Sequence, residues 1–74
     1  MIDQRTLAAV FAQVTRCLEG QDLALETLDA YKDDAARDLL TVERLRGFLQ
    51  GLWAAGVLPF EDYCEVDAML EATP

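Results

Sequence analysis

Residues 44–70 of the chain read RLRGFLQGLWAAGVLPFEDYCEVDAML. Large apolar side chains recur in the first half of this stretch at spacings of three and four residues, which predicts one apolar stripe along a helix. The stripe comprises Leu45, Phe48, Leu49, Leu52 and Trp53. Gly56 then stands where a helix needs a left-handed residue to end, and Pro59 suits the first turn of a following helix. The stretch therefore predicts an αα-hairpin, with one helix over about residues 42–55 and another over about residues 60–71.

A further helix is predicted at the start of the chain. Asp3 has the side chain of an N-cap residue, Ile2 and Leu7 stand in the positions of a hydrophobic staple, and Gly20 ends the helix. The apolar stripe of this helix comprises Leu7, Val10, Phe11, Val14 and Leu18. Its helical spacing predicts that the stripe is buried.

The next segment carries a second helix that Asp22 is expected to cap. The apolar face of this helix comprises Ala24, Leu28, Tyr31, Ala35 and Leu39. No Gly or Pro interrupts residues 32–46, so the second and third helices are either continuous or broken. Asp38 and Thr41 both offer N-cap chemistry, which places a break or kink over residues 37–41.

Length and composition indicate that the chain has more apolar surface than it buries alone. Its 74 residues form a single domain over residues 1–74, and 53% of them are hydrophobic. A chain of this length buries only about 60–65% of its unfolded surface, and the usual remedies are disulfides, a metal or association. Cys17 and Cys64 lack a Cys-x-x-Cys spacing and are predicted to be ordinary thiols, with a disulfide between them left open. We therefore expect an all-α bundle of three to four helices that associates as a homodimer.

A face for self-association is predicted on the first helix of the hairpin. Gly47 and Gly51 are four residues apart and therefore share one side of that helix. Each glycine lowers helix stability by about 1 kcal/mol relative to Ala, which indicates that another helix backbone approaches closely there. Phe48 and Leu52 flank the two glycines and complete the predicted contact.

The charge balance limits the partners of the chain. The net charge is −8 and the pI is about 4.1, so direct binding of nucleic acid or of an anionic membrane is not expected. The longest apolar run, residues 52–60, is far shorter than the ~20 residues of a membrane span. The first residues show no signal-peptide pattern. These features predict a cytoplasmic protein and allow a basic protein partner.

An acidic stripe and the single Trp are the predicted partner-binding residues. Asp22, Glu26, Asp29 and Asp33 follow one another at spacings of four, three and four residues, so they share one face of the second helix. This stripe is either a solvated face or a docking face for a basic protein. Trp53 is either a core residue or an exposed aromatic anchor, a residue type that carries much interface energy.

No catalytic, cofactor or metal site is predicted. The chain has no His, which removes the usual nucleophile pairs and the imidazole base at neutral pH. The paired carboxylates Asp33–Asp34 and Glu61–Asp62 lack partner ligands of other types and the loop spacing of a calcium site. We expect a protein that is not an enzyme.

Residues 49–70 resemble the short helical domain called SHOCT. That family carries a Leu-rich helix, then Gly-x-Ile-Thr-x-Glu-Glu-Phe, then a Leu seven residues later. The matching positions hold Gly56, Val57, Leu58, Glu61, Asp62, Tyr63 and Leu70. Pro59 replaces the capping Thr, and Asp67 stands where the family usually has Lys. The resemblance implies a small interaction or oligomerisation hairpin without catalytic residues.

Three functional hypotheses follow. The first is an acidic interaction module, a homodimer that binds and regulates a protein partner. The second is a small inhibitor or antiactivator of the type carried by phages and plasmids, whose acidic helix face blocks a basic, nucleic-acid-binding surface. The third is a helix-turn-helix DNA-binding regulator that uses Arg44 and Arg46, against which the net charge of the chain argues.

Overall fold

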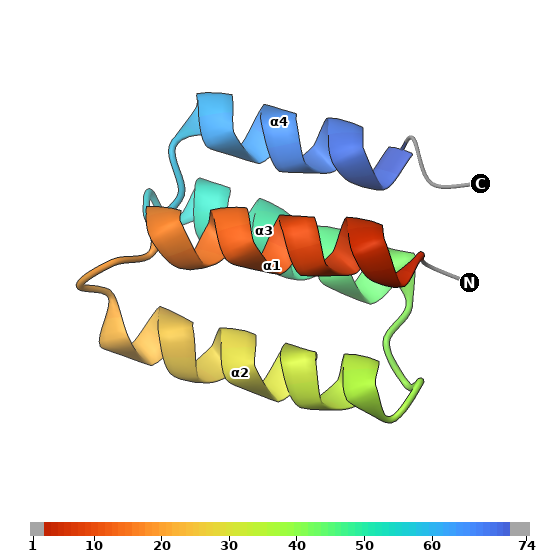
Figure 1. Ribbon diagram of the computed structural model, residues 1–74. Coiled ribbons are helices and arrows are strands. Elements are labelled where there is room, and N and C mark those ends of the chain that lie inside the picture. The colour runs from red at the N-terminus through yellow and green to blue at the C-terminus, as the bar shows by residue number, and fades with distance from the viewer. Residues whose placement is uncertain (1–2, 72–74) are drawn as a thin grey trace.

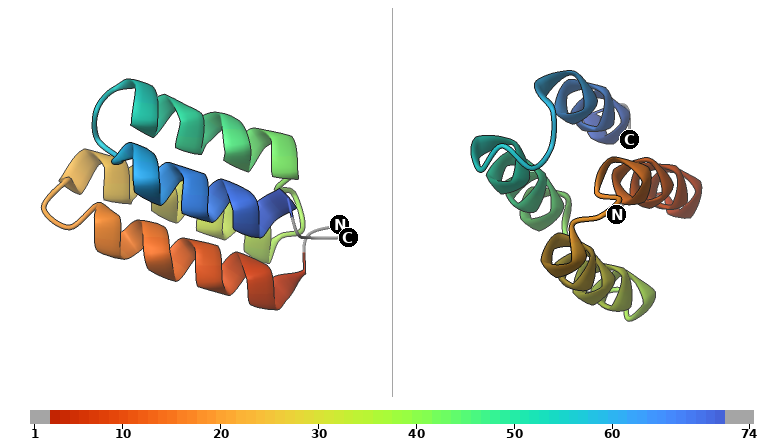
Figure 2. Two further views of the ribbon diagram at one scale, coloured as in Figure 1. Left: turned by 90° about the horizontal axis from the view of Figure 1, so that it is seen from above. Right: turned by 90° about the vertical axis from the view of Figure 1, so that its left-hand side faces the viewer.

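The computed structural model describes residues 3–71, which form four α-helices and no strand. These are α1 (Gln4–Cys17), α2 (Asp22–Ala36), α3 (Val42–Ala54) and α4 (Phe60–Glu71). Successive helices run in opposite directions, so α1 begins and α4 ends at the same end of the bundle (Figure 1). Seen end-on, the helices stand at four corners and α4 returns beside α1 (Figure 2). The predicted all-α bundle with a C-terminal αα-hairpin is confirmed.

The core is entirely apolar: among the described residues, no buried side chain is polar or charged. The buried residues are Leu7, Val10, Phe11, Val14, Leu18, Leu28, Leu45, Leu49, Leu52, Leu58, Val66 and Leu70. The predicted stripe of α1 is therefore confirmed in full. Helix α4 packs on α1 and α3, and α2 packs on α1. Only Leu28 of α2 is fully buried, so α2 is the helix least anchored in the core.

The ends of the first two helices differ in detail from the prediction. Asp3 is the N-cap of α1, but its carboxylate accepts a hydrogen bond from the Thr6 hydroxyl (3.3 Å) and not from a backbone N–H. The prediction that Asp22 caps α2 is wrong, because Gln21 holds the N-cap position and its carbonyl accepts the Leu25 N–H (2.9 Å). The predicted staple involves Ile2, which lies outside the described residues.

The predicted break between the second and third helices is confirmed. Asp38 has φ 60°, and the Asp38 and Leu39 amides donate to the Ala35 and Asp34 carbonyls (3.1 and 2.8 Å). This pair of bonds is a Schellman motif. It turns the chain out of the helix, so Leu39 lies beyond α2 and is 59% exposed. The prediction that Leu39 continues the apolar face of the second helix is wrong. Thr41 then caps α3 by accepting the Arg44 N–H at 3.2 Å.

The turn of the αα-hairpin repeats this geometry. Gly56 has φ 78°, and the amides of Gly56 and Val57 donate to the carbonyls of Trp53 and Leu52, each at 2.9 Å. The predicted left-handed end of α3 is therefore confirmed. Pro59 stands one residue before α4, where its carbonyl accepts the Tyr63 N–H (2.9 Å). Pro59 is thus at the N-cap position. The sequence had predicted it one position later, inside the first turn.

Two arginines tie α3 to its neighbours. Arg46 donates to both carboxylate oxygens of Asp67 on α4 (2.8 and 3.1 Å) and to Glu71 (3.3 Å). Hydrogen bonding to Asp67, followed by the charge of that carboxylate, raises the pKa of Arg46 above its ordinary value. Arg44 pairs with Asp34 of α2 at 2.9 Å. Both arginines are therefore paired with carboxylates of the chain itself. No helix within residues 3–71 is long and apolar enough to cross a membrane.

Candidate protein-binding surfaces

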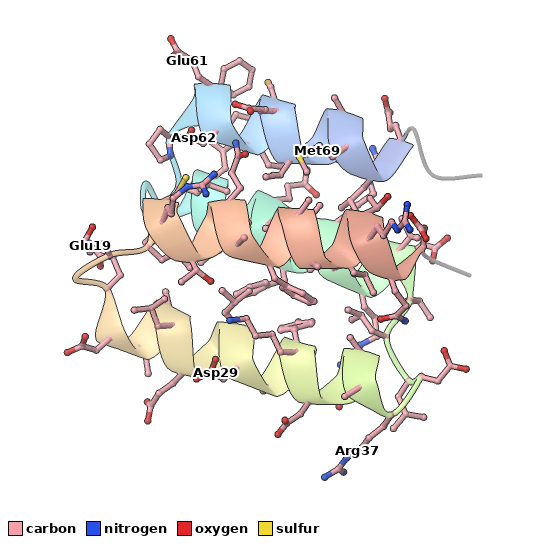
Figure 3. The ribbon with its side chains drawn as sticks, viewed as in Figure 1. Glu19, Asp29, Arg37, Glu61, Asp62 and Met69 are labelled. Atoms are coloured by element: carbon pink, nitrogen blue, oxygen red, sulfur yellow. The ribbon has the colours of Figure 1, made fainter. Side chains whose placement is uncertain are left out.

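The acidic stripe, consisting of Asp22, Glu26, Asp29 and Asp33, lies on the exposed side of α2. Its position follows from helical geometry: Leu28 points into the core, and residues spaced by four, three and four positions collect on the opposite side of the helix. Side chains with oxygen tips project from this side of α2, away from α1 (Figure 3). No other helix within residues 3–71 covers the stripe, so its four carboxylates are exposed.

The nearby cations neutralise little of this stripe. Lys32 lies 3.8 Å from Asp29, and both side chains are well exposed. Such an exposed ion pair contributes little to stability. Lys32 also donates to the Thr15 hydroxyl of α1 at 3.5 Å, which holds it toward α1 and away from the middle of the stripe. Arg37, just past α2, points away from the bundle (Figure 3). The outer side of α2 therefore keeps a negative field.

Trp53 belongs to an aromatic cluster on the surface of the hairpin. Its ring stacks on Tyr63 (centroids 5.0 Å apart, planes at 14°) and lies 5.1 Å from the tilted ring of Phe60. Trp53 is 37% exposed and Phe60 is 56% exposed. Trp53 is thus too exposed to be a core residue. It is not a freely protruding anchor either, because part of its ring is covered by α4.

The acidic stripe and Trp53 form two separate surfaces. Trp53 lies on the side of α3 that contacts α4, through Phe60 and Tyr63. The stripe lies on α2, which stands at the opposite corner of the bundle from α4 (Figure 2). The stripe and Trp53 therefore lie on different sides of the bundle (Figure 2).

The residues predicted for self-association also divide into two groups. Phe48 is partly buried and stacks on Tyr31 of α2 (centroids 4.5 Å apart, planes at 18°), and Leu52 is only 9% exposed. Gly47 and Gly51 face outward, and a Cβ built on either would meet nothing within 4 Å. No helix of the described chain makes the close approach that was predicted at these glycines. Their surface is open to another molecule.

The sequence did not reveal an apolar groove between the start of α2 and the end of α3, which we call the α2–α3 groove. It has a volume of about 310 Å³ and is lined by Gln21, Leu23, Ala24, Thr27, Phe48, Leu52 and Val57. Leu23 stands at its edge and is 77% exposed. The only sequence signal is Leu23 itself, a large apolar residue next to the acidic stripe. A smaller groove of about 220 Å³ lies between α1 and α2, and Leu7 and Ala35 are among the residues that line it.

Metal-ligand geometry and the two cysteines complete the description of residues 3–71. No group of three or more Cys, Asp or Glu side chains in residues 3–71 is arranged to hold a metal ion. Cys17 and Cys64 are free thiols, which contradicts a disulfide between them. Burial, followed by the charge of Asp62, raises the pKa of Cys17 above its ordinary value. A raised pKa leaves the thiol protonated at neutral pH and makes Cys17 a poor nucleophile.

Comparison with known proteins gives no relative: no protein-family model, no curated protein and no solved structure matches the chain. The resemblance of residues 49–70 to SHOCT therefore stays a prediction.

Proposed function

We propose that the protein is a non-enzymatic interaction module that binds and regulates a basic protein partner through the acidic stripe of α2. The observation that carries this proposal is the stripe itself: Asp22, Glu26, Asp29 and Asp33 are all exposed and aligned, and a single weak contact to Lys32 is their only ion pair in the described chain. Complementary charge steers association and suppresses wrong partners more than it adds raw affinity. The partner is therefore expected to present a row of Lys or Arg side chains.

Affinity capture with a charge-reversed variant tests this proposal. Tagged wild-type protein is used to capture partners from a lysate, and the captured proteins are identified by mass spectrometry. A variant with Lys at Asp22, Glu26, Asp29 and Asp33 should lose a basic protein that the wild type enriches. The matched control carries Lys at four exposed carboxylates off the stripe, namely Glu19, Glu43, Glu61 and Glu65. Equal loss with both variants, or no loss with the first, contradicts the proposal.

A second candidate function is favoured by the regularity of the stripe. With a rise of 1.5 Å per residue, Asp22 and Asp33 lie about 16 Å apart along α2, with two further carboxylates between them. A row of negative charges along one helix resembles the charge pattern of a nucleic-acid backbone. Such a module would act as an inhibitor that occupies the nucleic-acid-binding surface of its partner. Displacement of the captured partner by duplex DNA or by RNA supports this function, and simultaneous binding contradicts it.

Two further hypotheses concern DNA binding by a helix-turn-helix and the formation of a homodimer. The helix-turn-helix hypothesis loses support, because Arg44 pairs with Asp34 and Arg46 pairs with Asp67 and Glu71. A phosphate group would have to compete with these carboxylates. Homodimer formation stays a prediction. Light scattering at micromolar protein concentration tests it, and a mass that remains that of one chain contradicts it.

A further inference from the structure

The α2–α3 groove has a mostly apolar lining. Leu23, Ala24 and Thr27 line it from α2, Phe48 and Leu52 line it from α3, and Val57 closes its end. Its volume of about 310 Å³ is at the lower limit of small-molecule sites, which run from about 300 to 1,000 Å³. The groove is thus suited to one or two apolar side chains.

Small residues adjoin the α3 side of the groove. Gly51 adjoins the groove residue Leu52, and an added Cβ at Gly51 would meet nothing within 4 Å. Gly47, one helical turn before Gly51, is equally open. Ala54 and Ala55 extend this surface, and both are exposed. Small residues allow a helix backbone to approach closely, so an incoming helix can lie against α3 while one of its side chains enters the groove.

Two carboxylates of the acidic stripe adjoin the α2 side of the groove, although neither lines it. Asp22 precedes the groove residue Leu23, and Glu26 follows Leu23 by three residues and therefore lies one turn away on the adjoining face. No Lys or Arg lines the groove. The charges at its edge are thus complementary to a segment in which an apolar residue is flanked by Lys or Arg.

From this arrangement we infer that the α2–α3 groove binds an amphipathic basic helix of the protein partner. Its apolar anchor enters between Leu23 and Phe48, its backbone lies against Gly51, and its basic residues face Asp22 and Glu26. An amphipathic helix in an apolar groove is a recurrent mode of peptide recognition. The inference rests on the proposed function, because it names the part of the partner that the acidic module recognises.

A second copy of the chain fits the groove less well. Each copy carries a net charge of −8, so two copies repel. Among residues 3–71, the exposed large hydrophobic side chains are Leu23, Leu39, Trp53 and Phe60. Leu23 follows Asp22, Leu39 follows Asp38 and Phe60 precedes Glu61, so three of these potential anchors carry a carboxylate beside them. Such anchors would bring negative charge toward the negative edge of the groove.

Binding of designed peptides tests the inference. The probe is a synthetic helix of about 18 residues, long enough to form in water, with Ala and Lys throughout and one central Leu as anchor. A second peptide of equal charge has Ala in place of this Leu. Fluorescence anisotropy with labelled peptides should give an affinity about tenfold higher for the Leu peptide, since anchors dominate interface energy. Amide chemical-shift changes should centre on Leu23, Thr27 and Val57.

Two protein variants locate the site. Gly51→Gln places a side chain beside the groove without a change in net charge, and should weaken binding of the Leu peptide about tenfold. Because Gln favours a helix over Gly, this variant should unfold at a higher temperature than the wild type, which excludes misfolding as the cause. The matched control, Ala9→Gln on the exposed side of α1, should bind like the wild type. Leu23→Ala, which shortens the groove edge, should weaken binding and leave the fold intact, since Leu23 is 77% exposed.

The outcomes separate this inference from the proposed function. If stripe reversal abolishes capture of the basic partner but Gly51→Gln and Leu23→Ala do not weaken it, the groove inference is overturned and the proposed function stands. If equal affinity is found for the Leu and Ala peptides, the groove holds no anchor and the inference is overturned. A homodimer that Gly51→Gln dissociates overturns it in favour of a second copy. If stripe reversal leaves capture unchanged, the proposed function fails, and the inference falls with it.

Discussion

Two residues with positive φ end α2 and α3 in the same way, although only one of them is a glycine. Asp38 and Gly56 both occupy the left-handed position of a Schellman motif, with φ of 60° and 78°. The conformation brings the Cβ of an L-residue close to the following carbonyl oxygen, a cost of about 1–2 kcal/mol that is smaller for Asp and absent for Gly. The two positions therefore form a natural comparison within one chain.

Substitutions at these positions should have opposite effects on stability. Gly56→Ala should lower the free energy of unfolding by about 1 kcal/mol, because Ala meets the left-handed strain. Asp38→Gly should raise it by about 0.5 kcal/mol, because Gly relieves that strain at a small cost in chain entropy. Urea denaturation followed by circular dichroism measures both. A loss of stability with Asp38→Gly would show that the Asp38 side chain stabilises the turn by another contact.

Cys17 should be a slow and pH-sensitive thiol. Burial and the charge of Asp62 raise its pKa in the folded state, so the protonated thiol is favoured by folding. The corresponding stability is fully present below the pKa of the unfolded thiol and is lost as the pH rises through the higher folded pKa. Alkylation of Cys17 in a Cys64→Ser background should therefore show its midpoint above that of the urea-unfolded protein. Coincident midpoints would contradict the effect of Asp62 and burial.

At the scale of the helices, Arg46 connects the two helices of the hairpin. It bonds both carboxylate oxygens of Asp67, and it also reaches Glu71. Arg46→Gln should destabilise the fold more than Arg37→Gln, which removes the same charge from a residue that points away from the bundle. The difference between the variants should shrink in 1 M NaCl, where the Debye length is only about 3 Å. Thermal unfolding at low and high salt measures it, and equal effects of the two variants would refute the role of Arg46.

Helix α2 should open more readily than the other helices. It buries only Leu28 completely, and grooves of about 310 and 220 Å³ lie on its two sides. Local opening is favoured where few apolar contacts hold an element. In native-state hydrogen exchange, the amides of α2 should exchange faster than those of α1, which buries Leu7, Val10, Phe11 and Val14. Uniform exchange across the helices would mean that the bundle opens only as a whole.

The helices were predictable because their signals are local. Gly56 was predicted to end a helix because Gly adopts a positive φ, and Thr41 was predicted as a possible N-cap because its hydroxyl accepts a backbone N–H. Both predictions are confirmed. Leu39 was placed wrongly because the left-handed turn occurs at an Asp and not at a Gly. The apolar face predicted for the second helix was therefore extended one helical turn beyond its true end, from Ala35 to Leu39. Asp22 was misplaced by one position, because an acidic residue suits both the N-cap and the first turn of a helix.

At the scale of the whole molecule, the surfaces were only partly predictable. Periodicity was sufficient to align Asp22, Glu26, Asp29 and Asp33 on one side of α2. It was not sufficient to find the α2–α3 groove, because a groove depends on how far apart two helices pack and not on either helix alone. The separation of Trp53 from the stripe has the same origin, since the sequence does not state which helices occupy opposite corners.

The charge of the molecule should control its association with itself. At pH 7 the net charge of −8 opposes contact between copies, and this repulsion disappears near the pI of about 4.1. The exposed side chains of Leu23, Leu39 and Phe60 then have less opposition to contact with another copy. The mass measured by light scattering should rise as the pH falls from 7 toward 4, and added salt at pH 7 should act in the same direction. A mass that is independent of pH would contradict this.

The placement of α1 and α4 has a mechanical consequence. The start of α1 and the end of α4 lie side by side at one end of the bundle, and these two helices pack on each other (Figures 1 and 2). Tension applied through both ends of the chain acts across the seam, which is the packing interface between α1 and α4. It therefore separates the two helices one turn at a time, beginning at the end where the force is applied. The hairpin turn and the mouth of the groove sit at the far end of that seam, so they are the last parts of the molecule that such a pull disturbs.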